Sequence, residues 1–413
     1  MSPPEELPYL THDLPGTGGV IKSHASDFEV EEIPLYQPAG AGTHSYLWIE
    51  KEGLTTFDAI RLVARALGKK ERDVGYAGLK DARARTRQWL SVEHAPDLAP
   101  LAVDLPPALK VLATSRHQNK LRVGHLRGNR FRLRVRGVGA LAEPRARAIL
   151  DRLARTGMPA FFGAQRFGMH SSTHELGRAL LCRDAAGFFE RLLSPGAADA
   201  LARIRSGRLD AALEAIQPGP LHRYERDAVR ALQRARGDRE RAVAMLDRRM
   251  LRFYLAAYQS QLFNRVLAAR LGTCDRLIAG DVAYLHRNGA CFEVVDLDRE
   301  QPRAAAFEIS PSGPLFGPAM LLPREAALGF EQAVLAAEGV SADQFGAGPV
   351  RLDGARRPLR SPLTDIAVAA QGDELVVQFA LPPGMYASVA LREITKTGAP
   401  CELTADDAHA DAP

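Results

Sequence analysis

One aspartate in a strongly basic stretch is the residue best suited to carry out chemistry. Asp81 follows Lys80 directly, and Arg83, Arg85 and Arg87 come after it at alternate positions. Cations this close favour the ionised carboxylate, so we expect its pKa to lie at or below the ordinary value of about 3.9. Such a carboxylate can act as a nucleophile or as a base at neutral pH without a metal ion. The alternative is that Asp81 only neutralises a basic loop, since ion-pair networks are common.

A second group of residues combines positive charge with an asparagine and an aromatic ring. The sequence contains no Asp or Glu between Leu105 and Ala142. Four arginines in this stretch alternate with apolar residues, namely Arg130, Arg132, Arg134 and Arg136. The alternation predicts a strand with its arginines on one face, where they could bind RNA phosphates. Asn129 can hydrogen-bond a uracil edge, and Phe131 beside basic residues suits stacking on an unpaired base. The alternative is an amphipathic strand whose arginines are solvated or pair with acidic residues elsewhere.

Two further candidates lie near the ends of the chain. Lys22 precedes the alternating segment 27–31, where a lone lysine is ordinarily a surface residue. Tyr386 follows a Pro-Gly turn at the start of a predicted helix, so its ring could line a cleft. The alternative for Tyr386 is a place in the hydrophobic core.

Short strands and helices must position these residues. Alternating apolar residues predict strands over 27–31, 43–50, 88–92 and 131–136. A helix should begin at a Thr55 cap and end at Gly68, and another should span 145–156. The polar segment 80–87 then forms a loop between the apolar run 74–79 and the next strand. Residues up to about Gly19 are rich in proline and glycine, and we expect a loose arm there.

The middle of the chain has a different pattern. From about 172 to 272 the apolar residues recur with helical period, which predicts helices over 173–183, 188–193, 209–216, 224–235 and 242–271. Short strands follow at 281–285 and 290–295, then a helix over 325–338 and a hairpin of 365–370 with 374–379. A last segment spans 386–395. We expect an α/β (α+β) domain built from both ends of the chain and interrupted by a helical insertion.

Composition excludes several classes of protein. The chain has 413 residues, with 54 basic and 49 acidic side chains. No run approaches the roughly 18 apolar residues of a membrane helix, and the acidic N-terminus does not resemble a signal peptide, so we expect a cytoplasmic protein. The four cysteines form no metal-binding motif and should be free thiols. Phosphate-loop, zinc-protease and serine-hydrolase motifs are missing, and a glycosidase would need a second spaced carboxylate.

The aspartate loop also resembles a known signature. Gly78–Gln88 matches the pattern GxKDxxAxTxQ of the TruD family of tRNA pseudouridine synthases. Six other stretches resemble that family in the expected order: 27–31, 128–131, 162–168, 258–264, 311–314 and 381–393. Together they span residues 20 to 395.

The resemblance implies a fold and its division into domains. The family has a pseudouridine synthase catalytic domain with a mixed, mainly antiparallel sheet, interrupted by a mostly helical insertion. We therefore expect the catalytic domain at 1–158 and 311–401, the insertion at 159–310, and a disordered tail at 402–413.

The resemblance also implies an activity. Members isomerise a uridine of tRNA, most often uridine 13 in the D-arm, to pseudouridine, and they use no metal or organic cofactor. By position, Asp81 is the catalytic aspartate. Substrate-binding positions correspond to Lys22, Phe28, Asn129, Phe131 and Tyr386. We expect Arg130, Arg132, Arg134 and Arg136 to bind the RNA backbone, with tRNA as partner and no membrane. The default oligomeric state is a monomer. The alternative is a catalytically silent protein that binds structured RNA.

Overall fold

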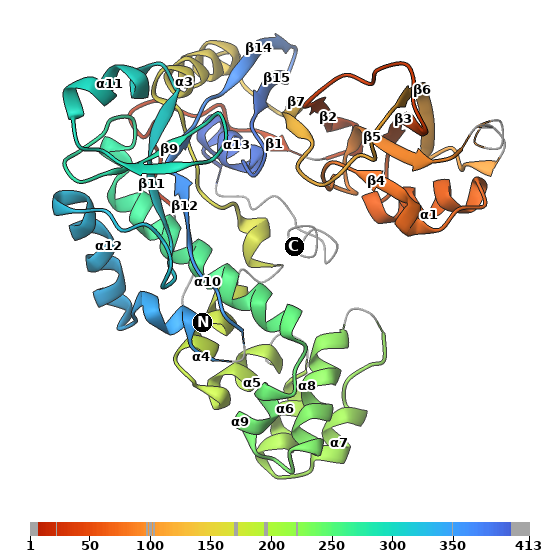
Figure 1. Cartoon of the computed structure of the whole chain (residues 1–413), viewed down its shortest axis with the longest axis vertical. Helices are drawn as coiled ribbons and strands as arrows, with labels where there is room; N and C mark the ends of the chain where they lie inside the picture. Colours follow the sequence, from red (N-terminus) through yellow and green to blue (C-terminus); the bar gives the residue numbers. More distant parts are fainter. Residues whose placement is uncertain are drawn as a thin grey trace.

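Figure 1 shows a computed structural model of the chain. It describes residues 7–397 except 22, 96–97, 99–100, 102–103, 169–171, 194–196, 220–221 and 349. The first part of the chain and its last strands form a large sheet across the top of the view. The middle of the chain forms a second sheet with flanking helices and a block of helices below.

The large sheet contains nine strands within the described residues. Its main path runs in the order β14 (Thr364–Gln371), β15 (Glu374–Leu381), β7 (Leu126–Arg136), β2 (Phe28–Pro34), β5 (Arg85–Glu93), β3 (His44–Lys51) and β6 (Leu109–His117). In addition, β1 (Val20–Ile21) pairs with β7, and β4 (Val74–Tyr76) pairs with β5. The β2–β5 pair is parallel, whereas the other pairs described in this sheet are antiparallel. The predicted mixed, mainly antiparallel sheet is therefore confirmed.

Helices cover one face of this sheet at both ends. Helices α3 (Ala142–Thr156) and α13 (Ala387–Thr395) bury Leu133, Val377 and their neighbours against the β14–β7 end. Helix α1 (Thr56–Ala66) buries Ile49 and Leu90 near the other end. It begins at the predicted cap, where the Asp58 N–H donates to the Thr55 hydroxyl and the Asp58 carboxylate accepts from the Thr55 N–H. The centre of the same face stays uncovered by these helices.

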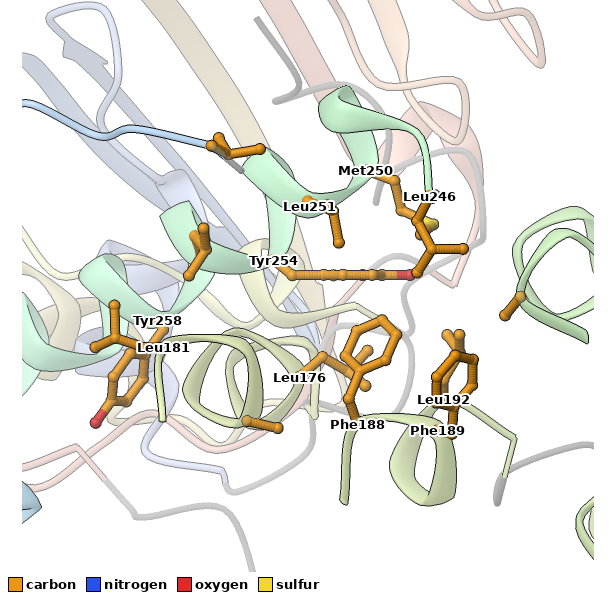
Figure 2. Close-up of a cluster of buried hydrophobic side chains, with 14 of the residues drawn as sticks. Leu176, Leu181, Phe188, Phe189, Leu192, Leu246, Met250, Leu251, Tyr254 and Tyr258 are labelled. Atoms are coloured by element: carbon orange, nitrogen blue, oxygen red, sulfur yellow. The ribbon is translucent and has the colours of Figure 1, made fainter. Parts of the chain in front are cut away.

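The middle of the chain is helical, as predicted. It contains α4 (Thr173–Leu181), α5 (Ala185–Leu193), α6 (Ala198–Arg205), α7 (Leu209–Glu214), α8 (Arg223–Arg234), α9 (Arg239–Ala244) and α10 (Arg248–Ala269). Figure 2 shows Phe188 and Phe189 of α5 facing Tyr254 of α10 in the core of this block. The single helix expected over 242–271 is wrong, because the Asp247 carboxylate accepts the Arg249 N–H at 2.7 Å and starts a new helix there. Helix α6 was not predicted.

A second sheet joins the helical block to the rest of the chain. It has the order β10 (Cys291–Glu293), β9 (Val282–Leu285), β11 (Ile309–Leu315) and β12 (Ala355–Pro358). Helices α11 (Leu297–Ala305) and α12 (Glu325–Glu338) flank it, and β13 (Arg360–Ser361) pairs with β8 (Met158–Pro159). The expected boundary at 310/311 falls inside β11. We therefore propose that the second catalytic segment begins near residue 362, where the chain returns to the large sheet.

The N-terminal arm is not loose over its described part, which corrects the sequence-based expectation. The buried Glu393 carboxylate of α13 accepts the Leu10 N–H at 2.8 Å, the Thr11 N–H at 3.1 Å and the Thr11 hydroxyl at 2.6 Å. The Arg392 guanidinium lies 3.7 Å from the centre of the Tyr9 ring. Charge-assisted hydrogen bonds and a cation–π contact thus fasten the arm to α13. The expected tail at 402–413 lies outside the described residues.

This clamp predicts a stability effect. Glu393→Ala would leave the Leu10 and Thr11 donors without their acceptor, so the free energy of unfolding should fall by about 2–3 kcal/mol. Thr11→Val removes one of the three hydrogen bonds and should cost less. Urea unfolding followed by circular dichroism measures both variants; equal stability of Glu393→Ala and wild type would show that the arm contributes nothing.

Candidate active site

The uncovered centre of the helix-bearing sheet face is polar. Residues directly opposite each other in a sheet point to the same side. One row of neighbouring side chains across the sheet consists of Phe131, Val30, Thr86 and Lys51. The adjacent row includes Leu381, Asn129 and Glu32. Thr86, Gln88, Lys51 and Glu32 are all buried. A patch of polar side chains therefore separates the apolar surface under α3 and α13 from the surface under α1.

The loop that contains Asp81 rests on this polar patch. The Lys80 ammonium forms an ion pair with Glu32 at 2.8 Å, and both side chains are almost fully buried. The Lys51 ammonium lies beneath the loop and donates to the carbonyl oxygens of Leu54 at 2.7 Å, Asp81 at 3.0 Å and Lys80 at 3.2 Å. All three donors of this ammonium thus have acceptors. The two lysines hold the backbone on both sides of the Cα of Asp81.

The remaining residues of the signature fix the loop further. The Thr56 hydroxyl accepts the Lys80 N–H at 2.9 Å and donates to the Gln88 side-chain oxygen at 3.1 Å. The Gln88 amide donates in turn to the Gly78 carbonyl at 3.1 Å. Within the loop, the Asp81 carboxylate accepts the Arg83 N–H at 2.8 Å. Gly78, Lys80 and Gln88 of the signature are therefore linked through Thr56 in one hydrogen-bond network, which holds the loop in place.

The electrostatics favour an anion at Asp81. Burial lowers the pKa of Lys51 to about 8, and the Asp81 carboxylate acts in the opposite direction. With that pKa, Lys51 is mostly protonated at pH 7. A buried cation below the loop favours the ionised form of the carboxylate above it.

Two buried oxygen atoms of the patch have no hydrogen-bond partner among the described residues. They are the Asn129 side-chain oxygen and the Thr86 hydroxyl. Buried polar atoms are usually satisfied, so such atoms often mark a place where a ligand binds. At Gly128 the chain passes close to Leu381. A side chain at this position would clash, because its Cβ would lie 2.3 Å from the Leu381 carbonyl oxygen. Asn129 is thus held beside Glu32, next to the aspartate loop.

The two predicted substrate-binding phenylalanines lie in the core beside the patch. Phe28 and Phe131 are 8% and 7% exposed, and their rings meet edge to face with centroids 6.2 Å apart. Phe131 also contacts Phe379 at 5.6 Å. They stabilise the sheet face beneath α3 and α13, and their role in binding a base stays a prediction.

Tyr386 belongs to a neighbouring aromatic cluster. It is the N-cap residue of α13, and its ring centre lies 6.0 Å from that of Phe162. The Arg357 guanidinium lies 4.3 Å from the Phe162 ring centre and donates to the Gly384 carbonyl at 2.8 Å. Since Leu381 pairs with Asn129, the chain leaves the polar patch at Leu381 and reaches Tyr386 five residues later. Lys22 lies outside the described residues.

The other family-like stretches meet at α10. The Asn264 side chain accepts the Phe162 N–H at 2.8 Å and donates to the Phe162 carbonyl at 3.0 Å. The Gln259 amide donates to the Phe316 carbonyl at 2.6 Å. These buried amides bind main chain, so they fix Phe162 and its neighbour Tyr386 relative to the helical block.

The arginines of β7 point to the opposite face of the sheet. Arg130 pairs with Glu31 at 3.0 Å and Asp365 at 2.9 Å, and Arg132 pairs with Glu29 at 3.1 Å. Arg134 pairs with Glu374 at 2.6 Å, and Arg136 with Asp27 at 2.7 Å. The alternative that these arginines pair with acidic residues elsewhere is therefore confirmed. Their contact with RNA phosphates stays a prediction.

Sequence reasoning missed three residues of the site, namely Glu32, Lys51 and Thr56. One signal was available, because Glu31 and Glu32 are adjacent in an alternating strand and one of them must point inward. Nothing in the sequence marked Lys51 or Thr56. Among the described residues no group of three or more metal-ligating side chains occurs, and no helix is long and apolar enough to span a membrane.

Comparison with known proteins gives the family. The family model for tRNA pseudouridine synthase D (TruD) matches residues 6–394. The chain is similar to the tRNA pseudouridine synthase D of Geobacter metallireducens, with 47% identity over 96% of this chain and 99% of the relative. The Geobacter sulfurreducens enzyme of the same name is 46% identical over 94% of this chain and 96% of its own.

A solved structure supports the fold. The crystal structure of a putative tRNA pseudouridine synthase D from Methanosarcina mazei superposes with a TM-score of 0.80 at 24% identity, covering 96% of this chain and 97% of that one. Since the family model and close relatives both match nearly the whole sequence, the chain belongs to the TruD family of RNA-modifying pseudouridine synthases.

Proposed function

We propose that this enzyme isomerises uridine 13 in the D-arm of tRNA to pseudouridine, with Asp81 as the catalytic carboxylate. Membership of the TruD family supports the reaction class. The observation that most supports Asp81 is the loop network: two buried lysines hold the Asp81 backbone over the polar patch, and the Asp81 carboxylate accepts the Arg83 N–H within the loop. A tRNA substrate also agrees with the expected cytoplasmic location and needs no membrane.

The chemistry requires few groups from the protein. The bond between N1 of uracil and C1′ of ribose breaks, the base turns, and a bond forms between C5 and C1′. C5 loses a proton and N1 gains one, so substrate and product have the same composition and no oxidant or reductant is consumed. An ionised carboxylate can attack C1′ or stabilise the charge that develops there. We infer that the base must leave its stack to reach Asp81.

The unpaired oxygens of the polar patch suit recognition of the base. The Asn129 side-chain oxygen can accept a hydrogen bond from the N3–H of uracil. Tyr386 follows Leu381, the partner of Asn129, by five residues, and Phe28 lies on the same strand and face as Glu32, so both aromatic rings are candidates to contact a base above Asn129. We keep Phe131 and Lys22 as further candidates for substrate binding.

Replacing the carboxylate tests the assignment. Asp81→Asn should lose at least 95% of pseudouridine formation on unmodified tRNA while the dissociation constant changes by no more than a few fold, because the amide keeps the volume but is not an anionic nucleophile. A pseudouridine-selective chemical label measures the product, and filter binding measures affinity. Normal turnover by a pure preparation of the Asp81→Asn variant would show that Asp81 is not the catalytic carboxylate. If the wild-type protein binds tRNA but makes no pseudouridine, the alternative of a catalytically silent RNA-binding protein is favoured.

The reaction should need no metal ion or added cofactor. We expect full activity in excess EDTA, because the proposed chemistry uses a carboxylate and the sequence has no metal-binding motif. The control is RNA folded before the chelator is added, so that loss of Mg²⁺ from the tRNA does not mimic an effect on the enzyme. Activity that disappears with EDTA and returns with Zn²⁺ or Mg²⁺ would contradict the prediction.

The arginines of β7 can be tested together. Because Arg132 and Arg134 pair with Glu29 and Glu374, the double variant Arg132→Gln/Arg134→Gln should lower the melting temperature, at a cost of about 1 kcal/mol. If these arginines serve only their ion pairs, the slope of log affinity for tRNA against log salt should stay unchanged. If these arginines instead bind phosphates, the slope should flatten by up to about two units. Thermal melts and a salt titration distinguish the two roles.

A further inference from the structure

A groove of about 460 Å³ lies between α1, β4 and the segment 120–123, and the chain leads from β4 into the aspartate loop. Figure 1 shows α1 and β4 on the right of the molecule, away from the helical block. The groove has room comparable to many small-molecule sites, which measure about 300–1,000 Å³. None of its lining residues belongs to the polar patch described above.

An aromatic pair forms one wall of the groove. Phe57 of α1 is 47% exposed, although it occupies the first turn of a helix that buries its opposite face. Its ring meets Tyr76 of β4 edge to face, with centroids 5.9 Å apart. An exposed face of Phe57 can stack on a base, because every nucleobase has a π face.

Positive charge lines the rim. Arg72, Lys120 and Arg122 border the groove together with one acidic residue, Glu71, which lies 3.7 Å from Arg61. The Arg72 side chain is 78% exposed, and its nearest acidic partner, Asp73, is 4.0 Å away. Arg122 forms no ion pair with any described residue. Cations around an exposed aromatic ring suit a base flanked by phosphates, because the ring can stack on the base while the cations neutralise the phosphates.

The floor of the groove is closely packed, and the chain leads from it into the aspartate loop. A Cβ at Gly75 would lie 2.3 Å from the Leu121 carbonyl oxygen, so the two segments are in close contact. The Gly124 N–H donates to the Ala77 carbonyl at 2.8 Å. Asp81 follows Tyr76 by five residues, which limits their separation to about 17 Å. A stacked strand with about 3.4 Å per nucleotide covers that distance in roughly five nucleotides.

We propose that this groove binds an unpaired nucleotide and its flanking phosphates from the same RNA whose uridine reaches Asp81. The base stacks on Phe57, and Arg72 and Arg122 contact the phosphates. This proposal rests on the proposed function, since it assigns a second contact to the same substrate. It adds a binding site that holds the RNA while the target uridine leaves its stack.

The aromatic wall can be tested with paired substitutions. Phe57→Ala should weaken the binding of unmodified tRNA by about fivefold or more, and Phe57→Tyr should restore it, because stacking needs a ring at this position. Phe57 is exposed, so both variants should melt like wild type. Product formation should show a raised KM with a retained kcat. Equal affinity of Phe57→Ala and wild type would overturn the proposal.

The charged rim needs a matched control. Arg72→Gln/Arg122→Gln should flatten the slope of log affinity against log salt by up to about two units. The control is Arg299→Gln/Arg287→Gln, which should leave the slope unchanged. Like Arg122, Arg287 is exposed and forms no ion pair with any described residue. Arg299 has the same 78% exposure and a similarly long ion pair with Glu300 at 3.7 Å, and α11 lies far from α1 in Figure 1. An equal slope in both double variants would overturn the proposal.

The experiments separate this proposal from the proposed function. Wild-type protein that binds tRNA without converting it would refute the proposed function, and the affinity comparison would still decide the groove. Wild-type protein that converts tRNA while every groove variant binds normally would refute the groove alone. A wild-type protein that binds no tRNA would refute both.

Discussion

The burial of charged side chains beneath the aspartate loop determines the geometry of the candidate active site. Lys80 and Glu32 form an almost fully buried ion pair, and the fully buried Lys51 binds three backbone carbonyls. A buried charge is costly unless it is paired and hydrogen-bonded, and removing one partner is more costly still. These groups are satisfied only when the loop lies over the patch. The cost of leaving them unpaired therefore fixes the position of Asp81.

The same sheet serves different purposes on its two faces. On the helix-bearing face, apolar residues under α3, α13 and α1 frame a small polar centre that contains the two unpaired oxygens of Asn129 and Thr86. On the other face, arginines of β7 alternate with glutamates of β2 and β15. Ion pairs between neighbouring strands stabilise their register modestly. We infer that the polar centre serves catalysis, whereas the charged face mainly supports the sheet.

Hydrogen bonds between buried side-chain amides of α10 and main-chain groups attach the helical block to the rest of the chain. Asn264 binds both polar groups of the Phe162 peptide, and Gln259 binds the Phe316 carbonyl. An N-terminal arm fastened to Glu393 supports α13 from its other end. Tyr386, at the start of α13, is thus positioned by elements that are distant in the sequence. Substitutions in the arm or in α10 would act on the aromatic side of the site without touching Asp81.

Local sequence patterns were enough to predict many of the strands and helices and the aspartate loop. Alternation predicted β2, β3, β5 and β7, helical period predicted most of the middle block, and the signature at Gly78–Gln88 predicted the family and indicated Asp81 as the candidate catalytic residue. Only the tertiary structure decided what those residues contact. Glu29 and Glu31 lie about a hundred residues before the β7 arginines, so the basic stretch 105–142, which has no acidic residue of its own, looked unpaired until the antiparallel register brought the two strands together. Lys51 lies just past the predicted strand 43–50 and drew no prediction, because its role depends on a loop thirty residues away in the sequence. Periodicity reports which face a side chain occupies, whereas its partners depend on strand order, which short-range patterns do not encode.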